Sequence, residues 1–109
     1  MTEITIFVHN EAYVGFIANQ HAGDGDATGE MVCHGVSALT LTCALSLSQI
    51  SNISEEEMSA EQAEAFLSLR IPYDLVDETT ETLFRSMIIG LEAIEREYDH
   101  YIKIETQEV

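Results

Sequence analysis

Apolar and polar residues alternate along the first part of the chain. A period of two is typical of a β-strand with one buried face. Residues 2–8 follow this period, with Thr5 and Phe7 on the side opposite the aliphatic residues. Residues 12–18 alternate in the same way after a short turn at 9–11, so we expect a β-hairpin. The aliphatic face of the first strand consists of Ile4, Ile6 and Val8.

Apolar residues recur at every third or fourth position in two longer segments, which predicts two amphipathic helices. The first runs from Met31 to about Gln49, and the second runs from about Asp77 to Tyr98. Thr28 or Gly29 would be a suitable N-cap for the first helix. The apolar stripe of the first helix contains Val32, Val36, Leu39, Cys43 and Leu47. The stripe of the second helix contains Leu83, Met87, Leu91, Ile94 and Tyr98.

Two remaining segments complete the pattern. Apolar residues just before Pro72 predict one or two strands within residues 53–71, and alternation over residues 101–106 predicts a final strand. The order ββα(ββ)αβ predicts an α+β fold, with two helices packed on an antiparallel or mixed β-sheet. A length of 109 residues suits a single domain that spans residues 1–109.

The charge of the chain argues against several functions. Twenty acidic residues and four basic ones give a net charge of −16. Phosphate groups repel such a surface, so we expect no direct nucleic-acid binding and no membrane binding. A basic protein is the natural partner, because negative potential raises the local concentration of a positive segment. Solubility alone is the other interpretation of this charge.

The cysteines and the absence of targeting patterns indicate a compartment. No apolar run approaches the roughly 18 residues that a membrane span needs, and the start MTEITIFVHN has no signal-peptide pattern. Cys33 and Cys43 lie about 15 Å apart along one predicted helix, whereas a disulfide needs Cα atoms within about 7 Å. We therefore expect a reducing, cytoplasmic environment. Cys43 falls in the apolar stripe and is expected to be a small core residue.

His21 ends the second predicted strand and Cys33 begins the first predicted helix, within about its first turn. The amides and dipole of a helix start favour a thiolate, and a nearby imidazole would complete a thiolate–imidazolium pair. Such a pair suits peptide hydrolysis, and amides at the helix start could stabilise the oxyanion. Ser37 lies one turn after Cys33 on the same face, where it could orient the thiol or contact substrate. Glu30 would oppose the thiolate if close to it, unless its role is to position His21.

The segment between these two candidates is rich in glycine and aspartate. Glycine lowers the preference for any one backbone path, and aspartate keeps a segment solvated. We therefore expect a flexible loop that is disordered without substrate and closes over it. The loop comprises Ala22, Gly23, Asp24, Gly25, Asp26, Ala27, Thr28 and Gly29.

Metal binding is an alternative chemistry for this region. Residues 24–29 match the opening of a calcium-binding loop, but its twelfth position, which must supply an acid, is Gly35. His21, Cys33 and His34 lack the regular spacing of a structural zinc site. We expect no metal and no cofactor, although a metal-binding regulator stays as a third possibility.

Several of these residues resemble the signature of the ribosomal-processing cysteine proteases. That signature reads approximately G-H-A, then a flexible loop, then D-I-V-C-A-x-V-S-A-L. The corresponding stretches here are residues 20–22, QHA, and residues 30–39, EMVCHGVSAL. Residues 90–91, GL, and 98–102, YDHYI, are similar to the G-L and Y-P-x-Y-I of the family. The resemblance spans nearly the whole chain.

The resemblance implies a homodimeric peptidase that removes a short N-terminal extension from large-ribosomal-subunit protein number twenty-seven before ribosome assembly. It places the catalytic histidine on His21, the nucleophile on Cys33 and the helix serine on Ser37. A basic ribosomal protein precursor would suit the acidic charge. A non-catalytic acidic module that docks on a basic ribosomal protein is the alternative.

This sequence departs from the signature at three positions. Gln20 replaces the glycine before the histidine, Glu30 replaces the aspartate, and His34 replaces the alanine after the cysteine. The change at Gln20 matters most, because glycine permits backbone conformations that glutamine avoids. It bears on the geometry of the loop and leaves both catalytic groups in place.

Overall fold

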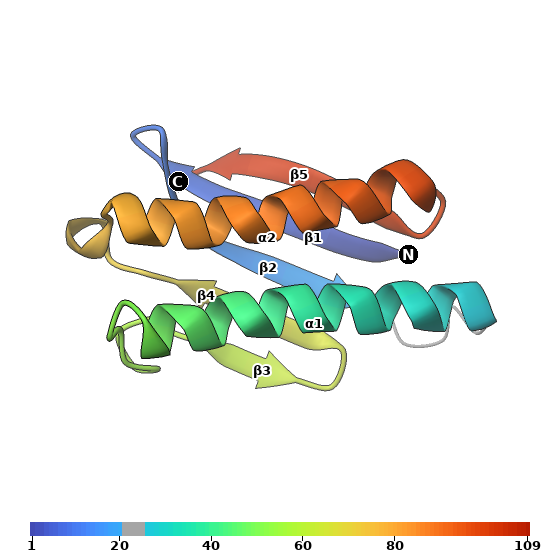
Figure 1. Cartoon of the computed structure of the whole chain (residues 1–109), viewed down its shortest axis with the longest axis horizontal. Helices are drawn as coiled ribbons and strands as arrows, with labels where there is room; N and C mark the ends of the chain where they lie inside the picture. The colour runs from blue at the N-terminus through green and yellow to red at the C-terminus, as the bar shows by residue number, and fades with distance from the viewer. Residues whose placement is uncertain (21–25) are drawn as a thin grey trace.

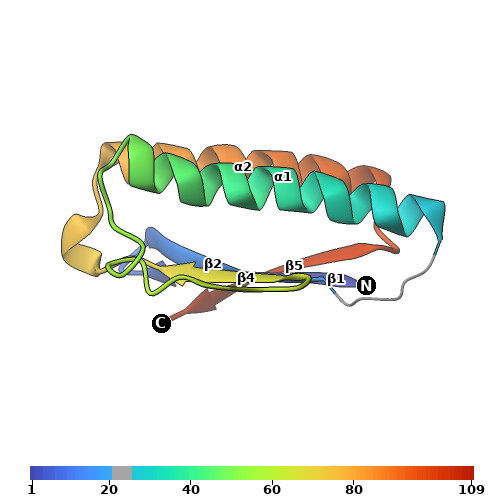
Figure 2. The same ribbon diagram turned by 90° about the horizontal axis from the view of Figure 1, so that it is seen from below.

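Two helices cover one face of a five-stranded sheet in the computed structural model, which describes residues 1–20 and 26–109 (Figure 1). A side view shows two layers, one of helices and one of strands (Figure 2). The strands are β1 (Thr2–His9), β2 (Ala12–Gln20), β3 (Glu61–Ala63), β4 (Phe66–Arg70) and β5 (Ile102–Glu108). The helices are α1 (Ala27–Gln49) and α2 (Glu78–Glu97), with a short 3-10 helix η1 (Tyr73–Leu75) before α2.

The expected α+β fold and the order ββα(ββ)αβ are confirmed. The strands lie in the order β3-β4-β2-β1-β5. Neighbouring strands are antiparallel except β1 and β5, which are parallel, so the sheet is mixed. Residues 53–71, for which the sequence predicts one or two strands, contain two.

The first and last strands bring distant parts of the chain to one end of the sheet. In the β1–β2 hairpin, Thr2 lies opposite Gln20, and in the parallel β1–β5 pair it lies beside Ile102. The hairpin turns at Asn10 and Glu11, whose φ angles of 49° and 67° suit a two-residue turn that follows the sheet twist. The N-terminus, the end of β2 and the start of α1 therefore lie at the same end of the molecule, opposite the C-terminus (Figure 1).

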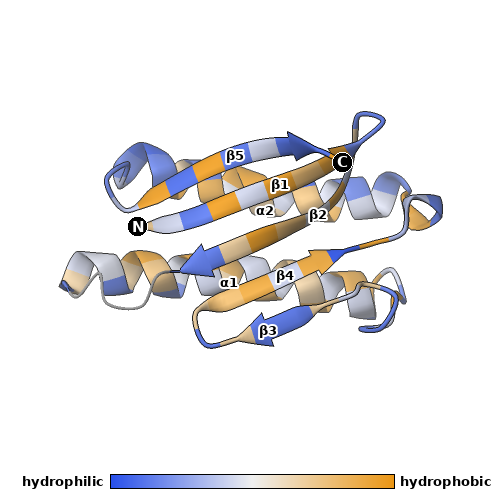
Figure 3. Ribbon diagram, turned by 180° about the vertical axis from the view of Figure 1, so that it is seen from behind, coloured by the Kyte–Doolittle hydropathy of each residue, from blue (hydrophilic) through white to orange (hydrophobic). Residues whose placement is uncertain are grey.

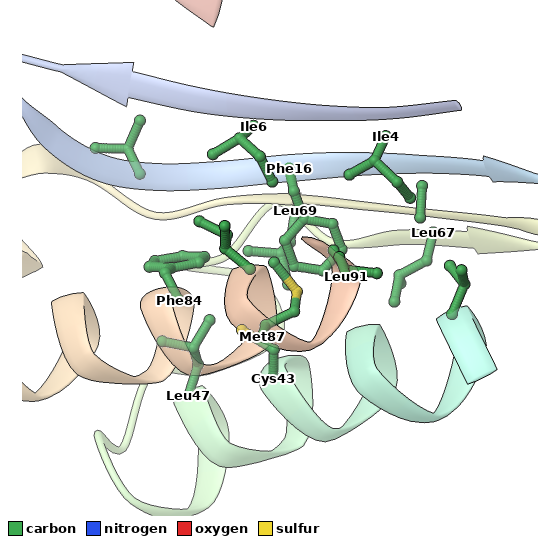
Figure 4. Close-up of a cluster of buried hydrophobic side chains, with 14 of the residues drawn as sticks. Ile4, Ile6, Phe16, Cys43, Leu47, Leu67, Leu69, Phe84, Met87 and Leu91 are labelled. Carbon is green, nitrogen blue, oxygen red and sulfur yellow. The ribbon is translucent and has the colours of Figure 1, made fainter. Parts of the chain in front are cut away.

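The hydrophobic core fills the space between the sheet and the two helices (Figure 4). Ile4 and Ile6 of β1 and Phe16 of β2 point from the sheet towards the helices, as the alternation predicts. The predicted stripe of α1 is confirmed, with Leu39 partly buried and four residues buried. Those four are Val32, Val36, Cys43 and Leu47.

The buried face of α2 is wider than its predicted stripe. Met87 and Leu91 are buried as expected, and Phe84 and Ile88 are buried in addition. The other stripe residues are partly buried: Leu83, Ile94 and Tyr98. The difference arises because α2 packs on both the sheet and α1, and each contact buries its own stripe.

A glycine lets the two helices approach closely. A methyl group at Gly90 of α2 would lie 2.9 Å from both terminal carbons of Leu39 of α1. That distance is shorter than ordinary van der Waals contact, so the missing side chain makes room for Leu39. The two helices can therefore pack side by side over the sheet (Figure 1).

One property of α1 differs from the sequence analysis, which expects no segment long and apolar enough to span a membrane. By length and composition α1 would be able to cross a membrane. Between residues 31 and 49 it carries no aspartate, glutamate, lysine or arginine. No continuous apolar run in the sequence indicates a possible membrane span, because serine, threonine and glycine interrupt the apolar residues of α1. The inner stripe of α1 is nevertheless built into the core of the fold.

The other face of the sheet carries no helix in the part of the chain that the structure describes (Figure 3). Its hydrophilic and hydrophobic residues are mixed, as the colouring of the strands shows. Lys103 and Glu105 form an exposed ion pair of 3.0 Å on β5. Cys33 lies elsewhere, at one end of the layer between sheet and helices, next to Thr2.

Candidate active site

Cys33 and Ser37 of α1 lie over the end of the sheet where β1 begins and β2 ends. The Sγ atom of Cys33 lies 3.8 Å from Oγ1 of Thr2, the first residue of β1. One turn later, the hydroxyl of Ser37 accepts a hydrogen bond of 2.9 Å from Nε2 of Gln20, the last residue of β2. Because Thr2 and Gln20 face each other across the two strands, these contacts place Cys33 and Ser37 on one side of α1.

The two cysteines occupy different environments. Cys33 is half-buried, whereas Cys43 is buried in the core. Burial raises the pKa of the Cys43 thiol to about 12, because the apolar surroundings disfavour its charged form. Cys43 is therefore an inert core residue, as the sequence predicts.

Helix α1 begins earlier than the sequence predicts. Its N-cap is Asp26, whose Oδ1 accepts a hydrogen bond of 2.7 Å from the backbone amide of Gly29. Ala27, Thr28 and Gly29 form the first turn, so they do not belong to the expected flexible loop. Neither Thr28 nor Gly29 is the cap. Aspartate is among the strongest N-cap residues, and here it outcompetes the threonine two positions later.

The earlier start moves Cys33 away from the end of the helix. Cys33 is the seventh residue of α1, about 10 Å along the axis from the N-cap. The expectation that it lies in the first turn is therefore wrong. The helix dipole acts mainly within the first turn, and amides further along are bonded within the helix. The helix start therefore provides neither the thiolate stabilisation nor the oxyanion donors that the sequence suggests for Cys33.

Tyr101 ties the helix cap to the first strand. Its hydroxyl donates a hydrogen bond of 3.0 Å to Oδ2 of Asp26, and its carbonyl accepts one of 2.8 Å from the amide of Thr2. Sequence analysis missed the roles of Thr2 and Tyr101. Tyr101 lies in the YDHYI stretch that resembles the family, which was its only signal. Thr2 gives none, because it is 31 positions from Cys33.

The residues on either side of segment 21–25 are held in place. Gln20 is fixed by its side-chain bond to Ser37 and by a backbone bond of 2.7 Å to the carbonyl of Ala65. Asp26 is fixed by Gly29 and Tyr101. His21 and residues 22–25 lie outside the described residues, so the predicted pairing of His21 with Cys33 and the mobility of that part of the loop stay predictions.

Glu30 lies exposed in the first turn of α1. A carboxylate there interacts favourably with the helix dipole, which gives Glu30 a structural role in addition to any role near the site. Its predicted support of His21 stays a prediction, as does substrate contact by Ser37. Within the described residues, no group of three histidine, cysteine or acidic side chains could hold a metal ion.

Comparison with solved structures shows the same fold in other proteins. The structure of SMU.848 from Streptococcus mutans has a TM-score of 0.83 at 17% identity, covering 100% of this chain and 96% of that one. A ribosomal processing protease Prp from Staphylococcus aureus, in complex with a substrate peptide, has a TM-score of 0.82 at 20% identity. The same protease with a covalently linked product peptide has a TM-score of 0.79 at 21% identity. Each of the two covers 98% of this chain and 100% of the other.

Comparison with curated protein sequences found no match. The profile of the family described as cysteine protease Prp, in contrast, matches residues 1–103. The match includes every residue of the site just described, from Thr2 to Tyr101. This protein therefore belongs to the Prp family of cysteine proteases.

Proposed function

We propose that this protein is an endopeptidase that removes the N-terminal extension of large-ribosomal-subunit protein number twenty-seven, with Cys33 as nucleophile and His21 as acid–base group. The observation that carries the proposal is the setting of Cys33, a half-buried thiol over the sheet end, in a chain that matches the Prp family over residues 1–103. The Staphylococcus aureus relative is described as a ribosomal processing protease, and one of its structures holds a covalently linked product peptide.

The chemistry requires two steps. The thiolate of Cys33 attacks the scissile carbonyl carbon, a C–S bond forms, and the carbonyl oxygen takes the negative charge. Collapse of this intermediate breaks the C–N bond, and the imidazolium of His21 gives its proton to the leaving amine. Water, deprotonated by His21, then attacks the thioester carbonyl carbon and breaks the C–S bond. The acid product is released, and the thiolate of Cys33 and the imidazolium of His21 are restored.

The charge of the chain supports a basic protein substrate. A net charge of −16 attracts a cationic segment and raises its local concentration at the enzyme. An acidic module that only binds would share this attraction. The two functions therefore differ in whether the bound protein is cut.

The direct test is incubation with the extended ribosomal protein, followed by intact mass measurement. The peptidase releases one defined N-terminal fragment, and Cys33→Ser abolishes its release. Cys43→Ser is the matched control, because it changes the other cysteine at a buried position and should keep cleavage. Binding without cleavage by the unaltered protein would establish the non-catalytic module instead.

The outer side of α1 supports a homodimer. Five exposed residues follow the alternating spacing of three and four that helix pairs use. This stripe lies in the charge-free stretch of α1, where two copies of a chain of −16 can approach with least repulsion. A basic partner would instead favour an acidic surface. The stripe consists of Met31, His34, Ala38, Leu41 and Leu45.

Sedimentation velocity tests this assembly. Leu45 is 58% exposed, and Leu45→Glu should convert the dimer to a monomer. Ile89→Glu is the control, because Ile89 is 53% exposed but lies on α2, away from the stripe. A dimer that survives Leu45→Glu would use another surface, and a monomeric parent protein would remove the homodimer from the proposal.

We place the protein in the cytoplasm, because both cysteines are free and one is the proposed nucleophile, which an oxidising compartment would endanger. Fractionation of cells, with detection of the native protein, is the measurement. Recovery in a membrane or extracellular fraction would contradict this location.

A further inference from the structure

Thr2 presents a buried hydroxyl to the sulfur of Cys33. The residue is 1% exposed, and its Oγ1 lies 3.8 Å from Sγ. Buried hydroxyl groups are nearly always hydrogen-bonded, because an unbonded one loses its hydrogen bonds to water and gains none in the protein. In the neutral pair either atom could be the donor. A thiolate carries no proton, so next to ionised Cys33 the hydroxyl must donate.

We propose that Thr2 is a further catalytic residue, whose hydroxyl donates a hydrogen bond to the Cys33 thiolate and so stabilises the charged nucleophile. The inference rests on Cys33 being the nucleophile of the proposed function. This hydrogen bond would supply the thiolate stabilisation that the helix start does not provide, because Cys33 lies beyond the first turn of α1. A donor to a charged group forms a stronger hydrogen bond than a donor to a neutral one.

The backbone around Thr2 holds this donor in position. Thr2 is paired with Gln20 on one side and Ile102 on the other, within a sheet interior. The amide of Thr2 donates to the carbonyl of Tyr101. The hydroxyl of Tyr101 in turn donates to the helix cap, Asp26. A β-branched side chain has few rotamers, so a fixed backbone largely fixes its hydroxyl. The donor is therefore arranged before substrate arrives, as electrostatic stabilisation requires.

The test compares alkylation of Cys33 with iodoacetamide across pH in the parent protein and two variants. Thr2→Val keeps the shape and removes the hydroxyl, and Thr2→Ser keeps the hydroxyl. We expect Thr2→Val to move the midpoint of the alkylation profile upward by about one pH unit, the scale of a hydrogen bond to a charged group. Thr2→Ser should keep the midpoint near that of the parent, and kcat/KM at neutral pH should fall about tenfold in Thr2→Val only.

Thr40→Val is the matched control. Thr40 is also 1% exposed, but its hydroxyl donates within α1, to the carbonyl of Val36. This variant removes a buried hydroxyl about 10 Å further along the helix from Cys33. It should lower the unfolding temperature without moving the alkylation midpoint. A similar midpoint shift in Thr40→Val would assign the effect to general loosening and overturn the role of Thr2.

Two further outcomes decide the matter. An unchanged or lowered midpoint in Thr2→Val overturns the proposal, because Thr2 would then accept from the thiol or do nothing. If Thr2→Val does not fold, Thr2→Ala carries the same expectation. The nucleophile is tested separately: loss of cleavage in Cys33→Ser with normal Thr2→Val kinetics overturns only Thr2, whereas cleavage by Cys33→Ser overturns the proposed function.

Discussion

The side-chain amide of Gln20 donates a hydrogen bond of 2.9 Å to the hydroxyl of Ser37, joining the end of β2 to α1 one turn after Cys33. Gln20 stands where the family signature has glycine. Gln20 is 8% exposed, so the substitution adds an internal hydrogen bond between sheet and helix rather than a surface group. The hydrogen bond ends one residue before His21 in the sequence.

Breaking this hydrogen bond should slow cleavage. Gln20→Leu and Ser37→Ala each remove one partner, and each should cost about 1 kcal/mol of unfolding free energy. Because both remove the same bond, their effects on kcat/KM should be less than additive in the double variant. Thr42→Val is the control, since its hydroxyl donates to Ala38 on the exposed side of α1. Fully additive losses would show that Gln20 and Ser37 act separately.

The two helix caps offer a matched pair for testing the frame of the site. Asp26→Ala and Asp77→Ala each remove an N-cap aspartate, so each should lower the unfolding free energy by about 1 kcal/mol. Only Asp26 also accepts from Tyr101, whose carbonyl holds Thr2. We therefore expect Asp26→Ala, but not Asp77→Ala, to reduce kcat/KM at a temperature where both are folded. Equal activities would mean that this link does not support the site.

Stability should fall at alkaline pH because of Cys43. Burial raises the pKa of its thiol from 9.0 to about 12, so between these values the unfolded chain has lost a proton that the folded chain keeps. Raising the pH through this window favours unfolding, by roughly 1 kcal/mol per pH unit. Chemical denaturation from pH 8 to 12 measures the slope. Cys43→Ala should lack this component, and identical slopes in both proteins would assign it to other groups.

Substrate capture should weaken with salt. The attraction between a chain of −16 and a basic protein acts over the Debye length, which falls from about 10 Å at 0.1 M to about 3 Å at 1 M. KM for the extended ribosomal protein should therefore rise across this range, with kcat little changed. A short uncharged peptide that spans the cut is the control substrate and should show a flat KM. The same flat response with the whole protein would leave solubility as the role of the charge.

Local pattern was enough to predict the elements, but not the contacts between them. The alternation in β1 and the stripe of α1 follow from burial of one face, a property of nearby residues. The cap was misplaced because Asp26 and Thr28 both suit that role, and Asp26 has in addition a hydrogen bond from Tyr101, 75 positions away, which no local pattern reveals. The contacts of Thr2 with Cys33 and Tyr101 join segments that are far apart in the sequence, so no local period predicts them.

The parallel pairing of β1 with β5 also has a consequence for the order of folding. β5 is synthesised after the other four strands of the sheet, yet Ile102 must lie beside Thr2, and Tyr101 must bond the amide of Thr2, before the residues beneath Cys33 are all in place. Pairing of such distant segments is the slow part of folding. Before β5 has been made, Thr2 has neither Ile102 beside it nor the carbonyl of Tyr101 to accept from its amide, so the surroundings of Cys33 are incomplete. With Cys33 as the proposed nucleophile, the order of synthesis therefore delays cleavage until β5 has been made and has paired with β1.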